Sequence, residues 1–61
     1  MKVTVHNVYS ENTDTYTGEP DQIREQLLQK YYFLKRYNNA SLSDDLRKLS
    51  QQQAYFIKVE E

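Results

Sequence analysis

The sequence predicts one α+β domain with the element order β-β-α-α-β: a three-stranded, mainly antiparallel sheet with two helices packed on one face. Residues near both ends of the chain alternate between apolar and polar side chains, as strands do. The middle of the chain instead repeats its apolar residues every three or four positions, as amphipathic helices do. A chain of 61 residues is long enough for a single domain, residues 1–61.

The first two strands are expected to form a hairpin. Residues 2–9 alternate β-branched side chains at period two, although Asn7 interrupts one face. Residues 10–14 have the composition of a turn, and residues 15–17 are expected to form a short second strand. The loop lacks the Asn-Gly pair that is typical of the tightest hairpins.

The first helix is expected over residues 22–37, directly after the only Gly and the only Pro of the chain. Pro20 suits the first turn of a helix, where its missing N–H costs nothing. Six residues fall in an arc of about 180° around the helix and form its predicted core face: Ile23, Leu27, Leu28, Tyr31, Leu34 and Tyr37. Tyr32 and Phe33 fall outside that arc.

A second, shorter helix is expected to begin at Ser41 or Ser43, because either side chain can cap it. Its apolar stripe consists of Leu42, Leu46 and Leu49. Asp44 and Asp45 lie in the first turn, where the helix dipole favours negative charge. Adjacent helical residues point in different directions, so these two carboxylates are not expected to act as a paired acid and base.

The third strand is expected over residues 54–60, with Tyr55, Ile57 and Val59 on one face. The other face carries Phe56 as well, and a strand with apolar residues on both faces is expected to be well paired rather than a free edge. The alternation does not determine whether this strand lies beside the first strand or beside the second.

The composition excludes several kinds of site. Without cysteine there is no disulfide and no thiol nucleophile, and His6 alone does not supply the usual ligands of zinc. A single glycine cannot build a phosphate-binding loop of the common types. His6 is expected to be a half-exposed strand residue. We therefore expect a protein that is not an enzyme and has no catalytic residues, no metal and no cofactor.

The sequence shows no membrane segment. No apolar run approaches the roughly 20 residues that span a bilayer, and the first ten residues lack the apolar stretch of a signal peptide. We expect a cytoplasmic protein with no membrane partner and no small-molecule substrate. Its short, cysteine-free, glycine-poor and tyrosine-rich composition resembles that of small accessory proteins of phages, prophages and plasmids.

Surplus aromatic residues on the first helix provide the main functional signal. On a helix with one buried face, Tyr32 and Phe33 would not point toward the core. Aromatic residues are enriched at the cores of protein interfaces. One interpretation is an aromatic patch, rimmed by Lys30 and Arg36, that binds a partner protein or forms a homodimer. The other is that this end of the helix is buried. A further binding mode is strand addition, in which a partner strand pairs with the short second strand, residues 15–17.

A basic cluster supports the alternative hypothesis. Lys30, Lys35, Arg36, Arg47 and Lys48 lie among tyrosines in the sequence, and aromatic rings beside positive charge are typical of surfaces that bind single-stranded nucleic acid. The net charge of −1 argues against a general nucleic-acid binder. The leading hypothesis is therefore a non-enzymatic protein-interaction module, and the alternative is a small nucleic-acid-binding or transcription-regulating protein.

Overall fold

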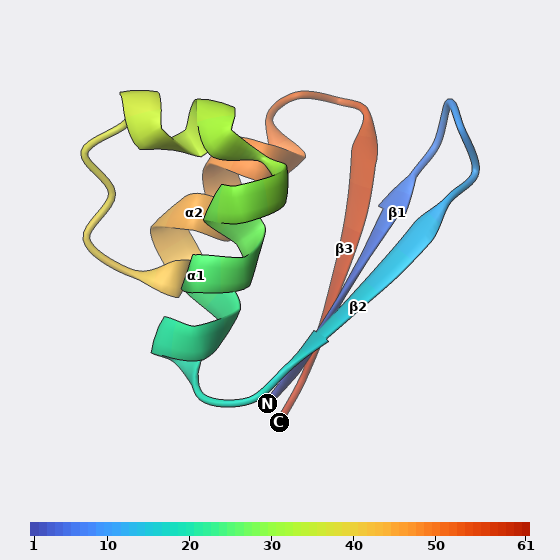
Figure 1. Cartoon of the computed structure of the whole chain (residues 1–61). Coiled ribbons are helices and arrows are strands. Elements are labelled where there is room, and N and C mark those ends of the chain that lie inside the picture. The colour runs from blue at the N-terminus through green and yellow to red at the C-terminus, as the bar shows by residue number, and fades with distance from the viewer.

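The computed structural model describes residues 1–61 and has the predicted element order. The elements are β1 (Lys2–Asn7), β2 (Thr13–Thr17), α1 (Pro20–Lys30), the short 3-10 helix η1 (Tyr32–Arg36), α2 (Leu42–Ser50) and β3 (Tyr55–Glu60). Figure 1 shows both helices on the same side of the sheet and both chain termini at the same end of it. The predicted α+β class and the placement of the helices are confirmed.

The sheet has the strand order β2-β1-β3, and both pairings are antiparallel. In the centre, Val3 lies opposite Tyr16 of β2 and opposite Val59 of β3. The last strand therefore lies beside the first. The expectation that it would be well paired rather than a free edge is wrong, because three strands leave only one central position. The hairpin pairs β1 with β2, and β3 joins the free side of β1, so β3 stays at an edge and Phe56 remains 71% exposed on the uncovered face.

Side chains and backbone close the hairpin loop. The Asn7 side chain ends β1, since its Oδ1 accepts hydrogen bonds from the backbone N–H groups of Tyr9 and Ser10 at 2.9 and 3.1 Å. The Asn7 N–H donates to the Asn12 carbonyl at 2.8 Å, and Glu11 takes a left-handed conformation with φ of 62°. The turn is thus longer than the two-residue type, as the missing Asn-Gly pair predicts.

The first helix begins where the Gly and Pro residues predict. Pro20 occupies its first turn, and the Glu19 N–H donates a hydrogen bond to Oε1 of Gln22 at 2.8 Å, which is one half of a capping box. Gly18 has φ of 128°, a conformation that L residues with side chains rarely adopt. A Cβ at this position would also lie 2.5 Å from Oε1 of Gln22, so the tight entry into α1 requires glycine.

The predicted helix over residues 22–37 is wrong in its second half. The helix ends at Lys30, and Tyr31 leaves the helical region with φ of −111° and ψ of 60°. Three consecutive aromatic residues favour helix weakly, and the buried Tyr31 ring instead packs edge-on against Tyr55 at 5.3 Å between centroids. The helical phase is lost there, so Tyr37 is 37% exposed and is not the core residue that the projection predicts.

The core between the helices and the sheet is small, with ten of 61 residues buried. Its apolar members are Val3, Val5, Tyr16, Ile23, Leu27, Tyr31, Leu34, Leu42 and Leu49. Leu28 and Leu46 pack partly against it, so most of the predicted helix faces are confirmed. Chains of this length bury a modest share of their surface, and their stability is correspondingly marginal.

A buried ion pair joins the two helices. Asp45 is 1% exposed, and its Oδ2 accepts a hydrogen bond from Arg24 Nε at 2.8 Å, while its Oδ1 accepts one from Asn39 Nδ2 at 2.7 Å. Arg24 Nη2 also donates to the Asn39 carbonyl at 3.1 Å. Asp44, by contrast, pairs with exposed Arg47 at 2.8 Å. From the sequence, both aspartates are expected to act as helix-end charges, but Asp45 holds the loop before α2 against α1.

Candidate functional site

The structure separates the two predicted aromatic anchors. Tyr32 is 72% exposed. Phe33 is half-buried and packs against the core, with its ring edge-on to Tyr31 at 6.5 Å between centroids. The predicted rim is divided as well, because Lys30 pairs with Asp14 of β2 while Arg36 lies exposed in η1. Of the two predicted anchors, only the Tyr32 ring is exposed.

The predicted basic cluster is divided in the same way. Lys30 pairs with Asp14, and Arg47 pairs with Asp44. Lys48 Nζ lies 5.0 Å above the centre of the Tyr37 ring, a cation–π geometry that links α2 to the end of η1. Lys35 and Arg36 are exposed and form no salt bridge.

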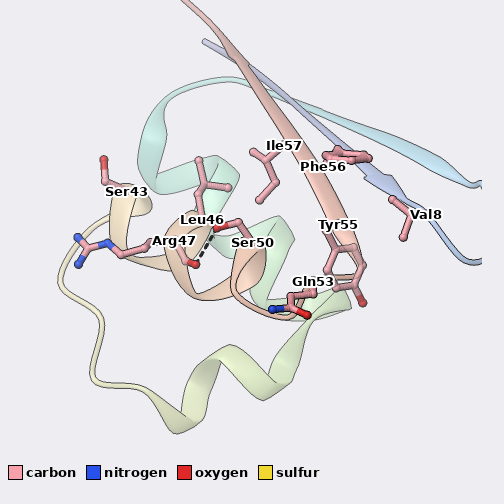
Figure 2. A pocket seen from close by; sticks show the side chains of 9 residues that line it. All are labelled: Val8, Ser43, Leu46, Arg47, Ser50, Gln53, Tyr55, Phe56 and Ile57. Carbon is pink, nitrogen blue, oxygen red and sulfur yellow. Dashed lines mark hydrogen bonds between the residues drawn. The ribbon is translucent and has the colours of Figure 1, made fainter.

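The largest hollow is an open groove of about 770 Å³ along α2 and β3. Leu46 of α2 and Ile57 of β3 lie in the space between the two elements (Figure 2). Tyr55 stands at one end, and Phe56 extends the apolar surface around the strand to its uncovered face. The groove thus brings together apolar side chains of both elements.

One stripe of α2 borders this groove. Ser43, Leu46, Arg47 and Ser50 all line it, and their spacing of three, four and seven residues places them on one helix face. The sequence pattern places Leu46 in the apolar stripe of its helix and Ile57 on one face of its strand, and it does not predict a groove. The signal that could have revealed it is the pair of apolar faces on residues 54–60, had that strand been recognised as an edge.

A second, smaller hollow of about 270 Å³ holds a group of titratable side chains at the loop end of the sheet. The hydrogen bond to the Asp14 carboxylate raises the pKa of Lys30. Burial raises the pKa of Tyr31, and burial also raises the pKa of Tyr16 next to it. These shifts move each pKa further from neutral pH, whereas general acid–base catalysis needs a pKa near the working pH. The group fits a structural role.

The remaining features to consider are His6, groups of metal-binding side chains, and the length and apolar character of the helices. His6 Nδ1 lies 2.8 Å from Thr13 Oγ1 across the hairpin. No group of three or more His, Asp or Glu side chains lies together in a way that could hold a metal ion. None of the helices combines the length and the apolar character needed to cross a bilayer.

Comparison with protein-family models, with characterised proteins and with solved structures finds no match for this chain, so any function has to be argued from the geometry above.

Proposed function

We propose that the protein is a non-enzymatic interaction module that binds a protein segment in the groove between α2 and β3. The observation that carries this proposal is the apolar groove itself, which runs beside a strand paired on one side only. Exposed apolar surface rimmed by polar side chains is typical of protein-binding sites. Here Leu46 and Ile57 supply the apolar floor, and Ser43 and Arg47 supply the rim.

The Tyr32 end remains a second proposed contact surface. Tyr32 and Arg36 are the residue types that dominate binding energy at many interfaces. This surface ranks second because Phe33 packs inward and Lys30 is engaged by Asp14, so a single aromatic ring has to provide the anchor. A cytoplasmic location and the absence of catalysis stay predictions.

The nucleic-acid alternative also stays a prediction. Of the five basic residues on which it rests, Lys30 and Arg47 are engaged in ion pairs. A continuous basic face is the usual footprint of a nucleic-acid surface. Here Lys35 and Arg36 are exposed on η1, whereas Lys48 of α2 is half-buried and contacts the Tyr37 ring. No specific observation favours this hypothesis over the groove.

Selection of random peptides displayed on phage against the immobilised protein tests the proposal. Phe56→Ser and Tyr32→Ser form a matched pair, because the two rings are 71% and 72% exposed and neither substitution disturbs the core. Peptides selected on the unmodified protein are expected to lose at least about tenfold in affinity on Phe56→Ser, which corresponds to about 1.4 kcal/mol, and to keep their affinity on Tyr32→Ser. The reverse pattern would move the site to the Tyr32 end.

A further inference from the structure

The free edge of β3 offers unpaired backbone groups along the groove. Val8 N–H donates to the Ala54 carbonyl at 2.9 Å, so residues of β3 in phase with Ala54 bond to β1. In an antiparallel ladder the residues between them point their N–H and C=O groups the other way. These residues are Tyr55, Ile57 and Val59, and no turn, loop or cap hydrogen bond engages their backbone.

The other edge of the sheet is less suited to a partner. By the same alternation, Thr13, Thr15 and Thr17 of β2 face outward, and the Thr17 carbonyl already accepts a hydrogen bond from Gln26 Nε2 at 3.4 Å. The threonine side chains give that edge no apolar surface. The edge proposed from sequence at residues 15–17 is therefore the weaker of the two, and the β3 edge is the better site for strand addition.

We infer that the occupant of the groove is a second copy of this chain, whose β3 pairs antiparallel with β3 so that Ile57 lies on a two-fold axis. This inference rests on the proposed function, because it names the partner of the same groove. The resulting sheet has the strand order β2-β1-β3-β3-β1-β2, and such a two-fold interface uses the same patch on both copies.

In this register, the side chains and backbone groups of the two β3 strands complement each other. Ile57 of one copy lies opposite Ile57 of the other, and Tyr55 lies opposite Val59, so all outward-facing backbone groups of both strands find partners. On the uncovered face, Phe56 lies opposite Lys58, where the ammonium can approach the ring. Glu60 lies opposite Ala54, and no like charges face each other directly.

Neighbouring registers are worse. An axis one residue toward the N-terminus places Val59 opposite Gln53, which lies outside the strand with φ of 58° and cannot continue a ladder. An axis one residue toward the C-terminus places Lys58 directly opposite Lys58 of the other copy, and facing like charges destabilise a strand pair. The chain itself therefore selects the register centred on Ile57.

The second layer of the interface comes from α2. A strand added to β3 carries Tyr55, Ile57 and Val59 on the face toward the helices, where they cover Leu46. A stable interface buries about 800 Å² on each partner, which is about a fifth of the 4352 Å² surface of this chain. Burying such an area also compensates for the small core, since oligomerisation is a usual means of stabilising a domain of this size.

Molar mass measured by light scattering over a wide concentration range tests the inference. We expect a dimer of twice the 7.4 kDa chain mass. Val59→Pro removes an outward N–H from β3, and Thr15→Pro removes one from β2, so both substitutions lie on edges where proline is tolerated. Val59→Pro is expected to raise the dimer dissociation constant at least about tenfold, and Thr15→Pro is expected to leave it unchanged, with far-UV circular dichroism confirming the fold of each.

Single cysteine substitutions test the register, since the chain has no cysteine of its own. Opposed residues in a hydrogen-bonded antiparallel pair have Cα atoms about 5.5 Å apart, within the range that a disulfide spans. Ile57→Cys should therefore oxidise to a covalent dimer. Val59→Cys is more exposed but lies about 13 Å from its own copy, so it should stay largely monomeric under denaturing conditions.

The outcomes separate this inference from the proposed function. A monomer at all concentrations, or a dimer that crosslinks through Val59→Cys and not through Ile57→Cys, overturns the inference. If the monomer still binds selected peptides and loses them on Phe56→Ser, the groove is an interaction site whose occupant is another protein. If neither peptides nor a second copy bind there, both the inference and the proposed function fail.

Discussion

Replacement of Asp45 by alanine tests the polar network that joins the helices. Removing one partner of a buried ion pair costs about 3–5 kcal/mol, because the other charge is left without compensation. The Arg24 side chain keeps 26% of its exposure and still donates to the carbonyl of Asn39, so water and backbone recover part of that loss. We therefore expect Asp45→Ala to lower the free energy of unfolding by about 2–3 kcal/mol.

That loss is large for this chain. At the usual 0.05–0.15 kcal/mol per residue, 61 residues give a total stability of about 3–9 kcal/mol. Urea unfolding followed by far-UV circular dichroism measures the change, and with a slope of about 1 kcal/mol per molar urea the midpoint should fall by about 2–3 M. Asp44→Ala is the matched control, because its partner Arg47 is exposed and such surface pairs contribute about 1 kcal/mol or less.

The double variant separates the pair from its surroundings. Arg24→Ala and Asp45→Ala together should cost clearly less than the sum of the two single substitutions, since the double variant leaves no unpaired buried charge. If Asp45→Ala costs no more than Asp44→Ala, or if the two single effects simply add, the carboxylate is solvated in solution and the argument for a buried network is refuted.

Two further predictions concern Tyr16, Tyr31 and Lys30. The buried Tyr16 hydroxyl makes no hydrogen bond of normal geometry, and the polar group that interacts with it is the neighbouring Tyr31 hydroxyl. Tyr16→Phe should therefore raise the free energy of unfolding by about 1 kcal/mol in the same urea titration, and a loss would show that the two hydroxyls bond in solution. The pKa values of Tyr16, Tyr31 and Lys30 are all raised in the folded protein. The unfolded chain therefore loses these protons at a lower pH than the folded protein, so these three groups leave stability unchanged below about pH 10 and lower it as the pH rises further. Urea midpoints that agree between about pH 8 and about pH 11 would contradict this.

Local signals in the sequence were sufficient for the order and type of the elements. Alternation predicted the strands, Pro20 and Gly18 marked the entry to α1, and the Ser41 side chain caps α2 as expected by accepting from the Asp44 N–H at 3.4 Å. These features depend on residues within one or two turns of each other. These features can therefore be predicted from the sequence without knowledge of any tertiary contact.

Tertiary structure decided where those elements meet. The break at Tyr31 depends on a ring contact with Tyr55, 24 positions later in the chain, and the role of Asp45 depends on Arg24 of another helix. The candidate groove exists only because β3 pairs with the outer side of β1 and remains an edge. Alternation shows which residues share a face of a strand, but neighbours across a sheet are set by long-range packing, and so the candidate site could not be located from the sequence alone.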